Sequence, residues 1–146
     1  MGTVRDILST KGSEVASIHR NCPVIDAARE MNRRRIGSLV VTEGPRVVGI
    51  FTERDILTRI VAEERDPKGL TVGQVMTAPV VCCTPETDLS ECKNVVTTRR
   101  IRHIPVVADG RLVGIVTSGD IIARESHDHE VTIESLCEYI GGPAPL

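Results

Sequence analysis

The hydrophobic positions of this chain follow helix and strand periods in a fixed order. Apolar residues at 24, 27, 28 and 31 have helical spacing, which predicts a helix over 24–35. β-Branched and apolar residues predict strands at 15–18, 36–41 and 47–51, and a turn at 43–45 joins the last two. A second helix is expected over about 55–64, before a break at 65–69. The first half therefore predicts the order β-α-β-β-α.

The second half predicts the same order again. Strands are expected at 80–83, 104–107 and 112–116, with an Asp-Gly hairpin turn at 109–110. Helical spacing predicts a helix over 89–100, and another begins at about Asp120. After a polar break at 126–130, a last helical pattern runs to Tyr139 and has no counterpart in the first half. We therefore expect one domain at 1–66, a second at 70–126, and a C-terminal helix and tail at 127–146.

The two halves share amino-acid sequence as well as the spacing of their hydrophobic positions. Residues 49–56 read GIFTERDI and residues 114–121 read GIVTSGDI, 65 positions later. The segments 3–8 (TVRDIL) and 71–76 (TVGQVM) also correspond. A repeat of this length indicates two copies of one supersecondary unit. Because a unit of about 60 residues buries too little surface to be robust alone, the two copies should pack together.

Composition narrows the classes of function. The chain has 146 residues, a net charge of −2, and only Phe51 and Tyr139 as aromatic residues, so the core should be aliphatic and nucleic acid is an improbable partner. No apolar run is long enough to cross a membrane. Five cysteines without a C-x-x-C pair fit a reducing compartment, and we expect a cytoplasmic protein with Cys82 and Cys83 as small core residues.

The repeated Thr-x-x-Asp at a strand-to-helix junction has two interpretations. In the structural one, Thr52 and Thr117 cap helices while Asp55 and Asp120 complement the helix dipole. In the functional one, the helix N-terminus and the Thr hydroxyl hold phosphate, and the Asp accepts both hydroxyls of a ribose. Gly49 or Gly114 would then permit close backbone approach.

With both motifs in register, the chain resembles a tandem pair of CBS domains, a Bateman module, over nearly everything from 3 to about 125. The resemblance implies an α/β fold of two tandem β-α-β-β-α units packed as a pseudo-twofold module, here with an added C-terminal helix. It also implies two clefts that bind adenosine-containing ligands: AMP, ADP, ATP, NAD or S-adenosylmethionine. By that resemblance the ribose and phosphate roles fall on Asp55 with Thr52, and on Asp120 with Thr117. Adenine would lie near Val15 and Ala16, or near Val80 and Val81.

Positive charge near these motifs suggests where phosphate would bind. Arg54 adjoins the first motif, and Arg102 and His103 precede a strand of the second unit. For His103 a purely structural hydrogen-bonding role is the alternative. The first unit has Gly37 and Ser38 at those positions, so the two clefts should differ chemically. No metal site is expected, and the His127-Asp128-His129-Glu130 cluster is interpreted as a solvated linker.

These patterns favour a stand-alone regulatory module that binds adenosine nucleotides and signals by conformational or oligomeric change. The alternative is a ligand-free dimerisation or protein-interaction module. The sequence has no nucleophile elbow, P-loop or zinc-protease motif, so we expect no enzyme and no catalytic cofactor. Partners are expected to be a nucleotide, a second copy in a homodimer, and a separate effector protein. The apolar stripe at 131–140 either covers its own module or reaches that second copy.

Overall fold

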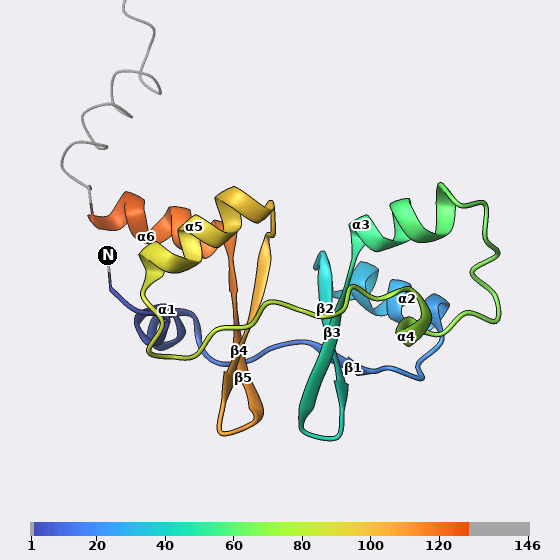
Figure 1. The fold of residues 1–146 in the computed structure, drawn as a ribbon, viewed down its shortest axis with the longest axis horizontal. Coiled ribbons are helices and arrows are strands. Elements are labelled where there is room, and N and C mark those ends of the chain that lie inside the picture. The colour runs from blue at the N-terminus through green and yellow to red at the C-terminus, as the bar shows by residue number, and fades with distance from the viewer. Residues whose placement is uncertain (1, 129–146) are drawn as a thin grey trace, which may run out of the picture.

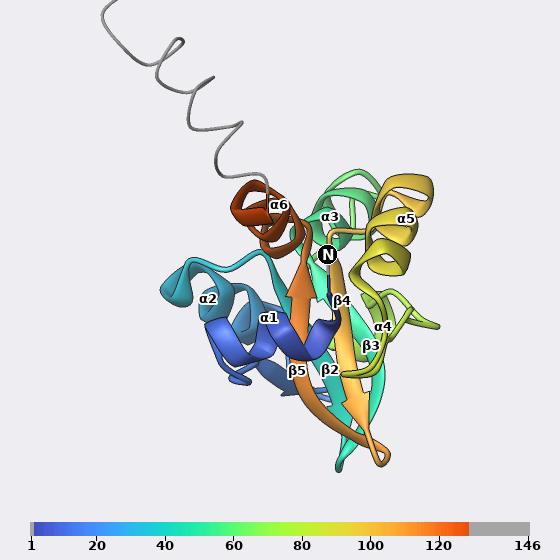
Figure 2. The ribbon, with the colours of Figure 1, turned by 90° about the vertical axis from the view of Figure 1, so that its left-hand side faces the viewer.

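The computed structural model describes residues 2–128 as two small α/β units that lie side by side (Figure 1). Each unit contributes a β-hairpin, and the two sheets meet where β3 contacts β5. Both hairpin turns lie at one end of the molecule, and the helices that follow the hairpins lie at the other end (Figures 1 and 2). The predicted α/β fold of two repeated units is confirmed. The predicted C-terminal helix at 131–140 lies outside the described residues.

The first unit contains a three-stranded sheet in the order β1-β2-β3. Strand β1 (Ser17–His19) runs parallel to β2 (Ser38–Glu43), and β2 pairs antiparallel with β3 (Arg46–Thr52). Helix α2 (Val24–Arg34) connects β1 to β2, and its predicted apolar face supplies Val24, Ala27 and Met31 to the core. After β3 the chain forms one turn of α3 (Glu53–Asp55) and then a π-helical segment, η1 (Ile56–Val61).

The second unit repeats this arrangement around the antiparallel pair β4 (His103–Ala108) and β5 (Arg111–Thr117). Helix α5 (Leu89–Arg99) precedes the hairpin, and α6 (Ser118–Asp128) follows it. The hairpin turn has positive φ at both Asp109 and Gly110, which matches the right-handed twist of the flanking strands. The predicted Asp-Gly turn is therefore confirmed.

Five expected boundaries or elements were wrong. Residues 80–83 form no strand, because within residues 2–128 only Cys83 bonds to β4, through Pro105 O and Val107 N, and Pro85 then lacks an N–H to continue the ladder. The first strand lies at β1 rather than 15–18. The helices after each hairpin begin directly after Thr52 and Thr117, earlier than expected, since those residues cap them. The polar break expected from residue 126 does not interrupt α6, which continues to Asp128.

The two units exchange their leading helices. Helix α1 (Val4–Lys11) begins the chain but buries Val4 and Ile7 in the core of the second unit. Helix α4 (Val72–Val75) precedes the second unit but buries Val72 and Val75 in the core of the first. Both helices begin with the same capping hydrogen bond, in which the backbone N–H of a Thr donates to a side-chain oxygen three residues later at a distance of 2.8 Å. The exchange ties the halves into one module, visible as two long crossing segments in Figure 1.

Candidate functional site

Asp55 ends the first motif, and its carboxylate is fully engaged inside the protein. Oδ2 accepts from the Thr52 N–H at 2.9 Å and from the Thr52 hydroxyl at 3.2 Å. Oδ1 accepts from the Thr77 hydroxyl at 2.7 Å and lies 3.4 Å from Arg59 Nε. The Asp55 side chain is only 5% exposed. Both oxygens are therefore already satisfied, and the capping interpretation of this motif holds in full.

Asp120 occupies the corresponding place in the second unit and is far more open. Oδ2 accepts from the Thr117 N–H at 2.9 Å, and the Asp120 N–H donates to the Thr117 hydroxyl at 3.1 Å. The ammonium of Lys11 donates to the same Oδ2 at 2.8 Å and to the carbonyl oxygen of Ile115 at 3.0 Å. The side chain is 23% exposed, and Oδ1 takes part in no hydrogen bond among residues 2–128. This oxygen is available to an incoming hydroxyl group.

The sheet register brings the other first-unit residues to the same end of their sheet. Ser38 pairs with Thr52, and the Glu53 N–H donates to the Gly37 carbonyl. Because β1 runs parallel to β2, Val15 and Ala16 lead into β1 beside Ser38, and Ala16 O accepts from the Val40 N–H at 3.1 Å. Arg54 lies beside Asp55 in α3, but its side chain is exposed and makes no ion pair with any residue in the described range.

In the second unit His103 pairs with Thr117, and the Arg102 carbonyl accepts from the Ser118 N–H at 2.9 Å. Burial lowers the pKa of His103, and the charges of Arg102 and Lys11 lower it further. The carboxylates of Glu53 and Asp120 oppose that shift. Glu53 belongs to the first unit, so His103 lies at the junction of the two units. Val81 and Ile104 both line one surface hollow. The preceding residue, Val80, is half-buried.

Sequence reasoning missed three residues that contact the two acidic side chains: Lys11, Arg59 and Thr77. Arg59 lies one helical turn after Asp55, so an i,i+4 ion pair was a readable signal. Lys11 is the last residue of the exchanged helix α1, and Thr77 follows the exchanged helix α4. No local pattern marks them, because their places depend on the exchange.

The two motif glycines do allow close approach, but to the exchanged helices. A Cβ at Gly49 would lie 2.6 Å from Met76 Sδ and 2.9 Å from the backbone oxygen of Thr77. A Cβ at Gly114 would lie 2.7 Å from a methyl carbon of Leu8. The packing of α4 and α1 against β3 and β5 thus accounts for the glycines without any ligand.

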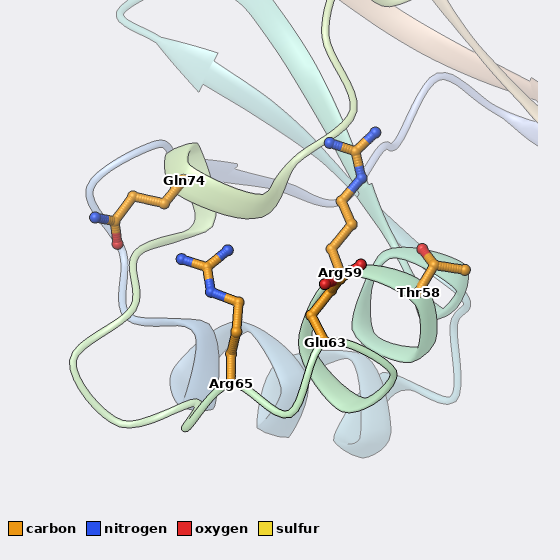
Figure 3. A pocket seen from close by; sticks show the side chains of 5 residues that line it. All are labelled: Thr58, Arg59, Glu63, Arg65 and Gln74. Atoms are coloured by element: carbon orange, nitrogen blue, oxygen red, sulfur yellow. The ribbon is translucent and has the colours of Figure 1, made fainter.

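Two surface hollows lie away from the acidic pair. One, of about 340 Å³, is lined by residues of η1, α4 and the segment between them: Thr58, Arg59, Glu63, Arg65 and Gln74 (Figure 3). Arg59 links this hollow to Asp55, since its Nη1 also donates to the Met76 carbonyl at 3.2 Å. The second, of about 440 Å³, lies between α5, the 81–83 segment and Ile104. Neither hollow is lined by Asp55 or Asp120.

Two kinds of feature are absent from the described part of the chain. Residues 2–126 hold no group of three or more His, Cys, Asp or Glu side chains placed to bind a metal ion. The side chains of the 127–130 cluster lie outside that description. Within the same residues no helix has the length and apolar character needed to span a bilayer.

Comparison with known proteins agrees with this architecture. The sequence model of the CBS domain matches residues 4–62 and 72–127. The mitochondrial CBS domain-containing protein CBSX3 of Arabidopsis thaliana is 34% identical over 149 residues, covering 96% of this chain and 72% of that protein. A signal-transduction protein with CBS domains from Burkholderia ambifaria, described as putative, has a TM-score of 0.81 at 36% identity, covering 86% of this chain and 95% of the other.

A third similar protein carries ligands. The CBS domain pair of protein MJ0100, in complex with 5′-methylthioadenosine and S-adenosyl-L-methionine, has a TM-score of 0.76 at 28% identity. The match covers 88% of this chain and 98% of that one. Two sequence matches in tandem, the repeated hairpin-and-helix units and these structural similarities lead to one conclusion: the chain belongs to the CBS domain family and contains a CBS domain pair.

Proposed function

We propose that this CBS pair is a cytoplasmic regulatory module that binds an adenosine-containing nucleotide beside Asp120, and that it acts by binding rather than by catalysis. The observation that carries the proposal is the open carboxylate of Asp120 next to the ammonium of Lys11. One oxygen is available for ribose hydroxyls, and the cation next to it suits a phosphate or a carboxylate. Asp55 also has a neighbouring cation, Arg59, but it offers no available oxygen, because Thr77 and Arg59 already contact its Oδ1.

Each nearby group has a role in this proposal. Asp120 accepts from the ribose, while Thr117 orients that carboxylate through its N–H and hydroxyl. Lys11 leaves Asp120 and turns to the ligand's anionic group, with the exposed Arg102 as a second cation. Adenine then packs toward Val80 and Val81, which are half-buried. The methylthioadenosine and S-adenosylmethionine bound by the MJ0100 pair support the choice of ligand class.

Lys11 also suggests how binding is signalled. It is the last residue of α1, a helix that belongs to the first half of the chain and packs in the second core. A ligand that replaces the Lys11–Asp120 ion pair therefore acts on the joint between the two units. The resulting change is transmitted to a second copy of the chain or to a separate effector protein.

Calorimetric titration with AMP, ADP, ATP, NAD, 5′-methylthioadenosine and S-adenosylmethionine tests the proposal. We expect at least one ligand to bind, and Asp120→Asn to weaken it about tenfold to a hundredfold, since a charge-assisted hydrogen bond contributes about 1.5–3 kcal/mol. Lys11→Met should weaken anionic ligands more than 5′-methylthioadenosine, which lacks a phosphate.

Asp109→Asn is the matched control, because Asp109 is an exposed turn residue at the opposite end of the hairpin. It should leave the affinity unchanged. If no ligand of the panel binds at millimolar concentration, the nucleotide assignment fails. If binding occurs and Asp120→Asn binds as tightly as the parent protein, the site is elsewhere.

A ligand-free homodimer is the second candidate, and one observation favours it. Leu57 and Val61 on η1 are each 61% exposed, and Ile122 on α6 is 62% exposed. Segment η1 continues helix α3, which lies with α6 at one end of the molecule in both views (Figures 1 and 2), so an isologous contact through this end would cover exposed apolar side chains. Sedimentation should show a dimer of the 15.9 kDa chain that Leu57→Ser weakens. A monomer at tens of micromolar concentration would contradict this candidate.

A further inference from the structure

Three of the chain's cysteines line the 440 Å³ hollow of the second unit: Cys82, Cys83 and Cys92. Cys83 and Cys92 are buried in the core cluster at the floor of the hollow, whereas Cys82 is exposed. Cys83 comes from the segment before β4, and Cys92 comes from the first turns of α5. The hollow thus opens onto two thiols that belong to different elements.

The two buried thiols belong to the same core cluster and line the same hollow. The interaction between these neighbouring thiols raises the pKa of Cys83 and lowers the pKa of Cys92. Cys92 also lies near the N-terminal end of α5, where the helix dipole favours a thiolate. The position of Cys92 near the N-terminal end of α5 therefore favours its ionisation over that of Cys83.

We propose that Cys83 and Cys92 form a reversible intramolecular disulfide when the protein meets a hydroperoxide such as hydrogen peroxide. The Cys92 thiolate attacks one peroxide oxygen, the O–O bond breaks, and the leaving hydroxide takes a proton to become water. The resulting sulfenic acid is attacked by the Cys83 sulfur, which forms the S–S bond, while the Cys83 proton leaves with the sulfenic hydroxyl as a second water. Two thiols lose two electrons in total, and the peroxide gains them.

The bridge would fix a joint that is otherwise weak. Among the described residues only Cys83, through its N–H and carbonyl, connects the 80–83 segment to β4. A disulfide to Cys92 adds a covalent link from that segment to α5. Because Val81 and Val80 lie only two and three residues before Cys83, oxidation restrains the backbone that the proposed nucleotide site uses, but bridge formation itself does not depend on nucleotide.

Peptide mapping of the full-length reduced protein tests the proposal. The folded protein is treated with hydrogen peroxide, free thiols are blocked with N-ethylmaleimide, and the unreduced chain is digested with a protease that cleaves after Glu86 and Glu91, which separates Cys83 from Cys92. Mass spectrometry should find these two peptides joined, lighter by two hydrogens, and separated again by dithiothreitol.

Single variants assign the bridge. Cys82→Ala should keep the linked pair, whereas Cys83→Ala and Cys92→Ala should abolish it. If a variant fails to fold, fragmentation of the linked peptides from the parent protein still shows whether Cys82 or Cys83 is joined to Cys92. The proposal is overturned if the parent protein links Cys92 to another cysteine. It is also overturned if both thiols are still alkylated, after unfolding, in protein exposed to enough peroxide to oxidise free glutathione.

Discussion

The two motif aspartates occupy equivalent places in the repeat, yet replacing them should have opposite consequences. Asp55→Ala removes the acceptor of three hydrogen bonds, from the Thr52 N–H, the Thr52 hydroxyl and the Thr77 hydroxyl, together with the contact to Arg59. These donors lie in a nearly fully buried place and would lose their partner. Breaking a buried charged network of this kind costs about 3–5 kcal/mol of unfolding free energy.

Asp120→Ala removes less from the fold. It loses the bond from the Thr117 N–H, a helix-cap contribution of about 0.5–2 kcal/mol, and a partly exposed ion pair with Lys11 that contributes at most about 1 kcal/mol. Water can reach the groups left behind. We therefore expect a loss of about 1–2 kcal/mol, with nucleotide binding as the property that suffers most.

Urea unfolding followed by circular dichroism, without nucleotide, measures both losses under the same conditions. Thr77→Val is the informative third variant, since it keeps the volume of the side chain and removes only the donor to Asp55 Oδ1. It should cost about 1–2 kcal/mol. Equal destabilisation by Asp55→Ala and Asp120→Ala, within about 0.5 kcal/mol, would refute the inference that the two motifs have diverged into a structural and a binding role.

Two further predictions concern packing and pH. Gly49→Ala should destabilise the protein by about 1–3 kcal/mol, because its Cβ would meet the backbone oxygen of Thr77, which cannot easily move. Gly119→Ala on α6 should not destabilise the protein, since its Cβ meets nothing closer than 3.6 Å. Thermal unfolding compares the two variants. Burial holds the pKa of His103 below 6.5, so the folded protein binds fewer protons than the unfolded chain and loses stability as the pH falls below that value. His103→Gln should show a smaller loss between about pH 7.5 and 5.5, and a loss as large as in the exposed-site control His19→Gln would contradict this account.

The sequence by itself determined the order of elements and the repeat. Helical spacing located α2 and α5, β-branched runs located both hairpins, and an Asp-Gly pair set the turn at 109–110, because each of these signals is local and acts through the backbone or one face of one element. The paired Thr-x-x-Asp motifs likewise marked both helix starts. The local signal was weak at 80–83. The sequence predicted a strand there, but the segment does not form a regular ladder with the neighbouring strand β4.

Only the tertiary structure decided how the equivalent motifs differ. Helices α1 and α4 each pack in the core of the other unit, a long-range choice that no local pattern encodes. That exchange places the Thr77 hydroxyl on one carboxylate and the Lys11 ammonium on the other, so Asp55 is closed while Asp120 stays open. Two motifs with the same spacing thus receive different chemistry, because burial and charge at a site are set by whichever distant segment packs against it.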